Sequence, residues 1–241
     1  MDKTEQMKIL VANLGSTTFK YKVFDMPAGQ VLAQGGMDRI GEGKGSVHKF
    51  RLGAGDEAEQ PCSLPDHAAA IDEALLRLTG DGGPLTSVDD LDAVGFKTVH
   101  ARAITGVVEL DEDVIGRMED FFRLAPAHNP AYVAAIRQFE RVAPAASRVG
   151  CFEPAFHGNA PLRRQLYAVP WHWYEDYGIR RYGFHGASHR YAAEKVIELE
   201  GTTQLRHINC HLGGSSSLCA VKDGVSRGAS HGLSPQGGVP Q

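Results

Sequence analysis

The sequence predicts an α/β fold in which helices flank a mixed sheet. Strand patterns come first along the chain, at residues 8–13, 18–25 and 31–33, and helical patterns then alternate with strands. That order is typical of a mixed sheet flanked by helices. Near residue 184 the pattern starts again, with a helix followed by three short strands. We therefore expect one domain followed by the start of a second copy.

Alternation of side chains identifies the opening strands. Phe19, Tyr21 and Val23 alternate with polar residues, which is the pattern of a strand with one covered face. Residues 8–13 are mostly apolar and end at a glycine turn, as a buried strand would. The segment 40–65 has weak periodicity, and we expect a loop there with one strand at 48–52.

Apolar spacing identifies the helices that follow. Gly80 is expected to end the first helix, and Asn129-Pro130 reads as an N-cap followed by proline at the first helical position. The expected helices are 66–78, 111–122, 129–142 and 184–200. The remaining expected strands are 93–99, 148–152, 206–211, 217–222 and 225–229.

Two segments of the chain align without a gap. Residues 13–18 (NLGSTT) match residues 211–216 (HLGGSS), and Val23 and Asp25 match Val221 and Asp223. A separation of about 200 residues is too long for a solenoid and suits a duplicated domain. We expect a first domain over 1–155 and the start of an incomplete second domain over 156–241.

Composition argues against several classes of protein. The chain has 241 residues, 42% hydrophobic and 22% charged, which is near the average for folded domains. A net charge of -4 provides no broad positive field for nucleic acid. No apolar run approaches the ~18 residues of a membrane span. The charge and the short apolar runs therefore lead us to expect neither nucleic acid nor membrane as a partner. The four cysteines form no C-x-x-C pair, so we expect a reducing cytoplasmic location.

The two matching turns suit phosphate. A tight glycine turn lined with serine and threonine presents backbone N–H groups and hydroxyls, which phosphate oxygens accept well. Two such turns would hold a polyphosphate from both sides. The alternative is a pair of ordinary hairpin turns, which use the same residues for conformational reasons. Neither turn is a Walker loop.

Several charged residues follow predicted strands. Glu153 comes directly after the strand 148–152, where a carboxylate would face a crevice, although a surface or capping glutamate has the same pattern. Lys97 lies near the end of another strand with His100 and Arg102 close by, and a solvated edge would look alike.

Two further pairs are weaker candidates. His185 and His189 are four residues apart and could bind a metal if both were helical, although no acidic third ligand is near. Cys210 and His211 are adjacent, but neighbours on a strand point to opposite faces, which disfavours a nucleophile and base pair.

Five motifs together resemble the acetate kinase family. In chain order they are VANLGSTTFKYKVFD, RLAPAHNP, CFEPAFH, YGIRRYGFHGASH and CHLGGSSS. The resemblance implies a ribonuclease H-like, actin-like ATPase fold made of two duplicated domains that clasp ATP. It also implies reversible phosphoryl transfer between ATP and a short-chain carboxylate, giving ADP and an acyl phosphate.

The resemblance also implies roles for individual residues. Asn13 would help to hold Mg²⁺ or Mn²⁺, and Ser16, Thr18 and Lys20 would approach the nucleotide phosphates. The second phosphate loop would consist of His211, Leu212, Gly213, Gly214 and Ser215. Glu153 would be the active-site carboxylate, and His185 would stabilise charge on the transferring phosphoryl group. Lys97, Val99, His128 and Pro235 would contact the carboxylate substrate.

The chain departs from the family pattern at four positions. Glu153 replaces an aspartate, Lys97 replaces an arginine, and Gly214 replaces an asparagine. Ala127 stands where a larger apolar residue is usual beside the acyl pocket, so propionate or butyrate could compete with acetate. The family pattern continues beyond Gln241, and we expect a longer protein that is a homodimer.

Two alternatives from other classes stay open. A non-catalytic nucleotide-binding relative would keep both turns while Lys97 and Glu153 diverge. A mixed-sheet structural protein would bind no ligand, and Mg-ATP would not shift its melting temperature.

Overall fold

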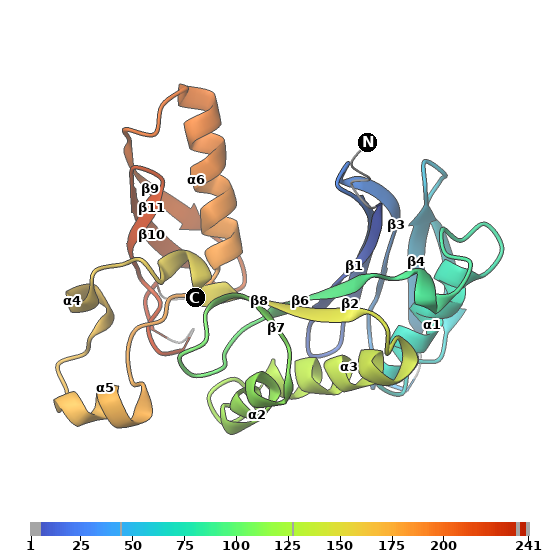
Figure 1. Cartoon of the computed structure of the whole chain (residues 1–241), viewed down its shortest axis with the longest axis horizontal. Coiled ribbons are helices and arrows are strands. Elements are labelled where there is room, and N and C mark those ends of the chain that lie inside the picture. The colour runs from blue at the N-terminus through green and yellow to red at the C-terminus, as the bar shows by residue number, and fades with distance from the viewer. Residues whose placement is uncertain (1–5, 44, 127, 235–236, 240–241) are drawn as a thin grey trace. The chain divides into compact units, whose positions relative to one another are not determined.

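The computed structural model describes residues 6–43, 45–126, 128–234 and 237–239 (Figure 1). Contacts divide the chain into two compact units. Unit 1 contains Met1–Thr98 and Val108–Gly150, and unit 2 contains Val99–Val107 and Cys151–Gln241.

An eight-stranded mixed sheet runs through the first part of the chain. Its order is β5-β4-β3-β2-β1-β6-β8-β7, with β1 antiparallel to β2 and parallel to β6. The predicted α/β class with a mixed sheet is confirmed. The strands are β1 (Met7–Leu14), β2 (Phe19–Met26), β3 (Gln30–Met37), β4 (Ser46–Leu52), β5 (Ala58–Cys62), β6 (Ala93–Thr98), β7 (Gly106–Glu109) and β8 (Ser147–Phe152).

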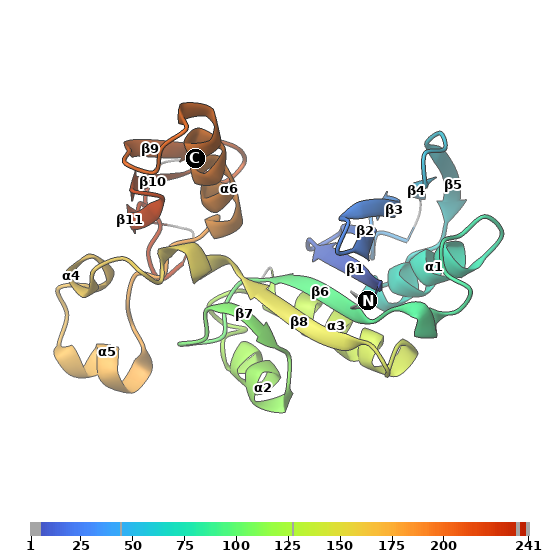
Figure 2. The ribbon, with the colours of Figure 1, turned by 45° about the horizontal axis from the view of Figure 1, so that its top comes forward.

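Helices of unit 1 cover one face of this sheet. α1 (His67–Thr79) packs against β2 and β3, and α3 (Asn129–Val142) packs against β6 and α1. Figure 2 shows α3 lying along β6, with α2 (Glu112–Asp120) beside it. The apolar residues beneath them are fully or nearly fully buried: Leu10, Ala12, Leu14, Phe19, Val23, Val94 and Phe96. The opposite face carries Val11, Asn13, Lys20 and Lys22, which are exposed.

Unit 2 contains a second, three-stranded antiparallel sheet. Its order is β11-β10-β9, from β9 (Arg206–His211), β10 (Ser217–Lys222) and β11 (Val225–Ala229). The helix α6 (Gly186–Glu200) buries Ala193 against Cys219 and Val221, with Phe156 beside them. Short elements precede it: the 3-10 helix Glu153–His157, α4 (Leu162–Gln165) and α5 (Trp171–Tyr177). Within the described residues, no helix combines the length and apolarity needed to span a membrane.

Several expected elements differ from the structure. The segment 40–65 contains two strands, because β5 pairs along β4 at the edge of the sheet, where Pro61 is tolerated. Asn129 is the first residue of α3 and His128 occupies the N-cap position. The Asn129 amide instead donates to the Met118 carbonyl oxygen at 2.8 Å, which explains why it is fully buried.

Candidate functional site

The first predicted phosphate turn joins β1 to β2 in unit 1. Asn13 and Lys20 are cross-strand partners, so both side chains leave the same exposed face of the sheet. Ser16 is exposed and Thr18 is half-buried in the turn itself. The Gly15 N–H donates to the Thr18 carbonyl oxygen at 2.8 Å and closes the turn. The structure therefore brings together the four residues predicted around this turn.

Two side chains hold this turn from the helical face. The Tyr132 hydroxyl of α3 donates to the Leu14 carbonyl oxygen at 2.9 Å. The His67 Nε2–H of α1 donates to the Gly15 carbonyl oxygen, also at 2.9 Å. These bonds fix the backbone on either side of the point where the strand turns.

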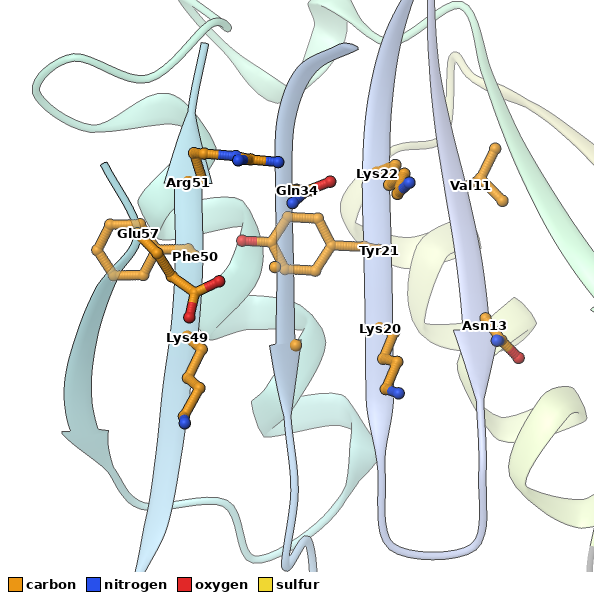
Figure 3. Close-up of a pocket in the computed structure, with 12 residues that line it drawn as sticks. Val11, Asn13, Lys20, Tyr21, Lys22, Gln34, Lys49, Phe50, Arg51 and Glu57 are labelled. Atoms are coloured by element: carbon orange, nitrogen blue, oxygen red, sulfur yellow. The ribbon is translucent and has the colours of Figure 1, made fainter. Parts of the chain in front are cut away.

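A pocket of about 610 Å³ lies on the exposed face beside Asn13 and Lys20 (Figure 3). The described cationic side chains that line it are Lys20, Lys22, Lys49 and Arg51. They come from β2 and β4, and Glu57 lines the same pocket. The excess of cations suits an anionic ligand.

The donor set near Asn13 fits a metal ion only in part. Asn13 offers one amide oxygen, and Mg²⁺ is usually held by one or two protein oxygens together with substrate phosphates and water. Among the described residues no group of three or more His, Cys, Asp or Glu could hold a metal ion. The residues present therefore fit an ion that is bound jointly with nucleotide phosphates.

The second predicted phosphate turn joins β9 to β10 in unit 2. His211 is the cross-strand partner of Ser217, and residues 212–216 form the turn. Leu212, Gly213 and Gly214 are exposed and Ser215 is half-buried. The Ser216 hydroxyl closes the turn, since it lies 3.3 Å from the Gly213 nitrogen and 3.2 Å from the Gly213 carbonyl oxygen.

Five histidines gather beside this second turn, and we call them the histidine cluster: His157, His185, His189, His211 and His231. The imidazoles of His185 and His211 stack with centroids 3.9 Å apart. The hydroxyl of Ser217 lies 2.9 Å from His185 Nδ1 and 2.8 Å from His189 Nε2. His211 Nδ1 lies 2.9 Å from the Ser188 hydroxyl.

The motif YGFHGASH folds as it does because of two glycines. Gly183 has a φ of +73°, and a Cβ there would lie 2.6 Å from the His157 ring. A Cβ at Gly186 would lie 1.9 Å from the Glu153 carbonyl oxygen. Between them His185 takes a left-handed conformation, with φ 57°, as the N-cap of α6. Its backbone N–H faces Glu153 Oε2 at 3.4 Å, so the carboxylate lies at the positive end of the helix.

Burial keeps three members of the cluster neutral. It lowers the pKa of His189 to about 4, and it lowers the pKa of His157 and of His231 as well. His157 Nε2–H donates to the Phe184 carbonyl oxygen at 3.0 Å, and His231 Nε2–H donates to the Ser216 carbonyl oxygen at 2.9 Å. These hydrogen bonds orient the His157 and His231 rings beside the second turn.

The other predicted site residues lie elsewhere in the two units. Lys97 is half-buried on β6, and His128 is half-buried just before α3, both in unit 1. Val99 is buried in unit 2. Pro235, predicted to contact substrate, and Ala127, predicted beside the acyl pocket, lie outside the described residues.

The structure does not place His185 and His189 on one helix, which the possible metal pair required. His185 precedes α6 instead of belonging to it, and it meets His189 on the Ser217 hydroxyl. Sequence reasoning also missed His157, His231 and Ser217. The FEPAFH and CHLGGSSS motifs contain two of these, but nothing local indicates that their side chains converge on His185.

Comparisons with known proteins agree on one family. The model of the Acetokinase family matches residues 8–240. The acetate kinase of Carboxydothermus hydrogenoformans is 40% identical over 97% of this chain and 59% of its own length. That of Limosilactobacillus fermentum is 39% identical over 96% of this chain and 58% of its own length. The chain thus spans less than two thirds of these relatives.

Solved structures give the same result. The crystal structure of the Porphyromonas gingivalis acetate kinase matches 95% of this chain and 58% of its own, with a TM-score of 0.82 and 36% identity. A propionate kinase from Francisella tularensis matches the same shares with a TM-score of 0.85 and 27% identity. The predicted actin-like ATPase fold class is confirmed by these neighbours. On both sequence and structure, the chain belongs to the acetokinase family.

Proposed function

We propose that this protein transfers the γ-phosphoryl group of ATP to a short-chain carboxylate. The reaction is reversible and gives ADP and an acyl phosphate. The observation that carries the proposal is the gathering of Glu153, His185 and His211 at the N-terminal end of α6, in a chain of this family.

Phosphoryl transfer requires alignment and neutralisation of charge more than covalent chemistry. In the proposal, His185 donates to an oxygen of the transferring phosphoryl group, and the loop His211–Ser215 offers backbone N–H groups and hydroxyls to the nucleotide phosphates. Glu153 is the active-site carboxylate and orients the His185 backbone. Lys20 adds positive charge, and Asn13 contributes one ligand to a Mg²⁺ or Mn²⁺ ion. When bound, that ion neutralises phosphate oxygens and fixes their geometry.

Lys97, Val99, His128 and Pro235 form the proposed carboxylate-binding set. Lys97 would pair with the substrate carboxylate as a point charge, where an arginine would bind it with two parallel hydrogen bonds. Acetate is the first acceptor to test. Propionate and butyrate follow because the sequence has alanine at position 127, where the family pattern has a larger apolar residue.

The test is a hydroxamate assay for acyl phosphate on the full-length protein with Mg-ATP. Acetate, propionate and butyrate are supplied in separate reactions. Product with at least one acid supports the proposal, and no product with any of them contradicts it. A strong preference for acetate over both longer acids would reject the roomier pocket.

The second candidate is a non-catalytic nucleotide-binding relative. Lys97, Glu153 and Gly214 favour it, because each departs from the family pattern at a position expected to serve the reaction. Calorimetry would then show ATP binding without turnover. The double variant Lys97→Arg with Glu153→Asp would not restore activity, whereas a weakened enzyme would recover it.

Cytoplasmic location, a homodimer of the full-length protein and domains at 1–155 and 156–241 belong to the same proposal. Size-exclusion chromatography with light scattering tests the dimer. Limited proteolysis tests the domain boundary, which should be cut near residue 155.

A further inference from the structure

One buried hydroxyl joins two members of the histidine cluster. Ser217 on β10 is 0% exposed, and its Oγ is within 2.9 Å of both His185 Nδ1 and His189 Nε2. His189 is 1% exposed, so water does not compete for this bond. Ser217 is the cross-strand partner of His211, whose ring stacks on His185. Ser217 therefore lies beside the ring that the proposed reaction uses.

One hydroxyl hydrogen has to serve two ring nitrogens. A serine hydroxyl donates one hydrogen bond, and a neutral imidazole carries its proton on only one nitrogen. If Ser217 donates to His185 Nδ1, then His189 must donate Nε2–H to the Ser217 oxygen. If Ser217 donates to His189 Nε2, then His185 must donate Nδ1–H. In either case the two neutral histidines carry their protons on the same ring position.

We propose that Ser217 and His189 are positioning residues that hold His185 in its Nε2–H form. His189 Nε2–H donates to Ser217, and the Ser217 hydroxyl donates to His185 Nδ1. His185 then has a donor at Nε2 for a phosphoryl oxygen, a use that rests on the proposed function. The reverse arrangement would leave a lone pair at Nε2, which repels such an oxygen.

The surroundings of His185 are compatible with this chain of hydrogen bonds. The stacked His211 ring limits rotation of the His185 ring, and His211 Nδ1 is itself bound to the Ser188 hydroxyl. Among the described residues, other titratable groups near His185 include Glu153, next to its backbone N–H, and His231, with its ring centroid 5.0 Å away. Burial holds the His189 ring neutral, as the chain of bonds requires.

The test is the tautomer of each ring in the 241-residue chain labelled with ¹⁵N-histidine. Long-range ¹H–¹⁵N correlation spectra at about pH 8, above the ordinary histidine pKa, distinguish Nε2–H from Nδ1–H. Signals are assigned with His185→Gln and His189→Gln. We expect both rings in the Nε2–H form. Different forms in the two rings, or Nδ1–H in both, would overturn the proposal without any serine variant.

Serine variants test whether the Ser217 hydroxyl determines the tautomer of His185. Ser217→Ala is expected to change His185 from one tautomer to a mixture, and Ser217→Thr, which keeps the hydroxyl, should retain the original form. The matched control is Ser226→Ala, because Ser226 is also 0% exposed and bonds to a different histidine, His157 Nδ1, at 2.9 Å. It should leave the His185 and His189 signals in place.

An unchanged His185 tautomer in folded Ser217→Ala would show that the hydroxyl only fills space, which overturns the proposal. If that variant does not fold, the wild-type and Ser217→Thr spectra still decide. These spectra are recorded without any enzymatic reaction. Failure to form acyl phosphate would therefore contradict the proposed function alone.

Discussion

The two turns that align in sequence form hairpins that differ by one residue in register. In the first hairpin Leu14 pairs with Phe19 across a turn of four residues, 15–18. In the second His211 pairs with Ser217 across a turn of five residues, 212–216. Because side chains alternate along a strand, a shift of one residue reverses the face that every side chain of the first strand occupies.

Burial follows that shift along the two leading strands. Leu10 and Ala12 are 0% exposed, whereas their sequence equivalents Ile208 and Cys210 are exposed, Ile208 to 68%. On the returning strands the pattern is unchanged, since Phe19 and Ser217 are both 0% exposed. Asn13 therefore leaves its sheet on the open face, while His211 joins the histidine cluster. The same strand, turn and strand pattern places its leading polar residue in two different environments.

The largest expected effect concerns the packing on which the second hairpin depends. Gly186→Ala would place a Cβ 1.9 Å from the Glu153 carbonyl oxygen, a backbone atom that cannot move aside alone. We expect a loss of about 3 kcal/mol or more from the stability of unit 2. Hydrogen exchange measured by mass spectrometry should show faster exchange in residues 206–222 and little change in residues 7–26.

The matched control for that variant is Gly214→Ala. A Cβ at Gly214 would have no neighbour within 4 Å, so stability should change by no more than about 0.5 kcal/mol. Equal destabilisation by both substitutions would show that the clash at Gly186 is absent.

The second prediction concerns the loss of folding stability at low pH. Burial lowers the pKa of His100, His157, His189 and His231 in unit 2, and that of His48 in unit 1. Their folded pKa values lie below the unfolded value, so the unfolded chain binds more protons as pH falls. Stability is present above about pH 6.5 and is lost as pH falls toward the folded pKa of about 4 for His100 and His189.

We expect unit 2 to lose about 2 kcal/mol or more over this window, and more than unit 1. Hydrogen exchange at pH 7 and at pH 5, corrected for the intrinsic rate, gives the loss in each unit. Equal losses in the two units would contradict the difference in buried histidines.

The sequence predicts single strands and helices better than it predicts which face of a strand is buried or which distant side chains meet. Strands expected at 206–211, 217–222 and 225–229 have those bounds, because alternation is a local signal. The missed strand β5 holds a proline at the sheet edge, and the missed helix α5 buries no residue, so neither carries a periodic apolar pattern. The gapless alignment gave no sign that the second turn uses one residue more.

The histidine cluster shows the same limit at the level of the site. His185 and His211 are predicted from their motifs, but the cluster draws its rings from the segment after β8, the start of α6, β9 and the segment after β11. Only the fold brings these segments together. Ser217 is the last residue of the CHLGGSSS motif, but its importance follows from its pairing with His211 in the observed register.

The third prediction tests the register directly through thiol labelling. Cys210 is exposed and Cys219 is buried on the neighbouring strand, so they are internal references for fast and slow modification. Burial also raises the pKa of the Cys219 thiol, which slows it further. In the first hairpin Val11→Cys should react like Cys210, and Ala12→Cys should react at least about ten-fold more slowly. Faster reaction at position 12 than at position 11 would show that the two leading strands present the same face.

The smallest expected effect concerns the support beneath the first turn. Tyr132→Phe removes the hydroxyl that donates to the Leu14 carbonyl oxygen, and the buried carbonyl loses that donor. We expect a loss of about 1 kcal/mol in the free energy of unfolding by urea, with faster hydrogen exchange at residues 7–26.

Tyr177→Phe is the control, because Tyr177 is 61% exposed on α5 and its hydroxyl can bond to water. If both substitutions left exchange at residues 7–26 unchanged, the first turn would be held by its own backbone bond between Gly15 and Thr18. A selective effect of Tyr132→Phe would mean that the first hairpin is fixed from beneath by a helix, whereas the second is fixed by the rings beside it.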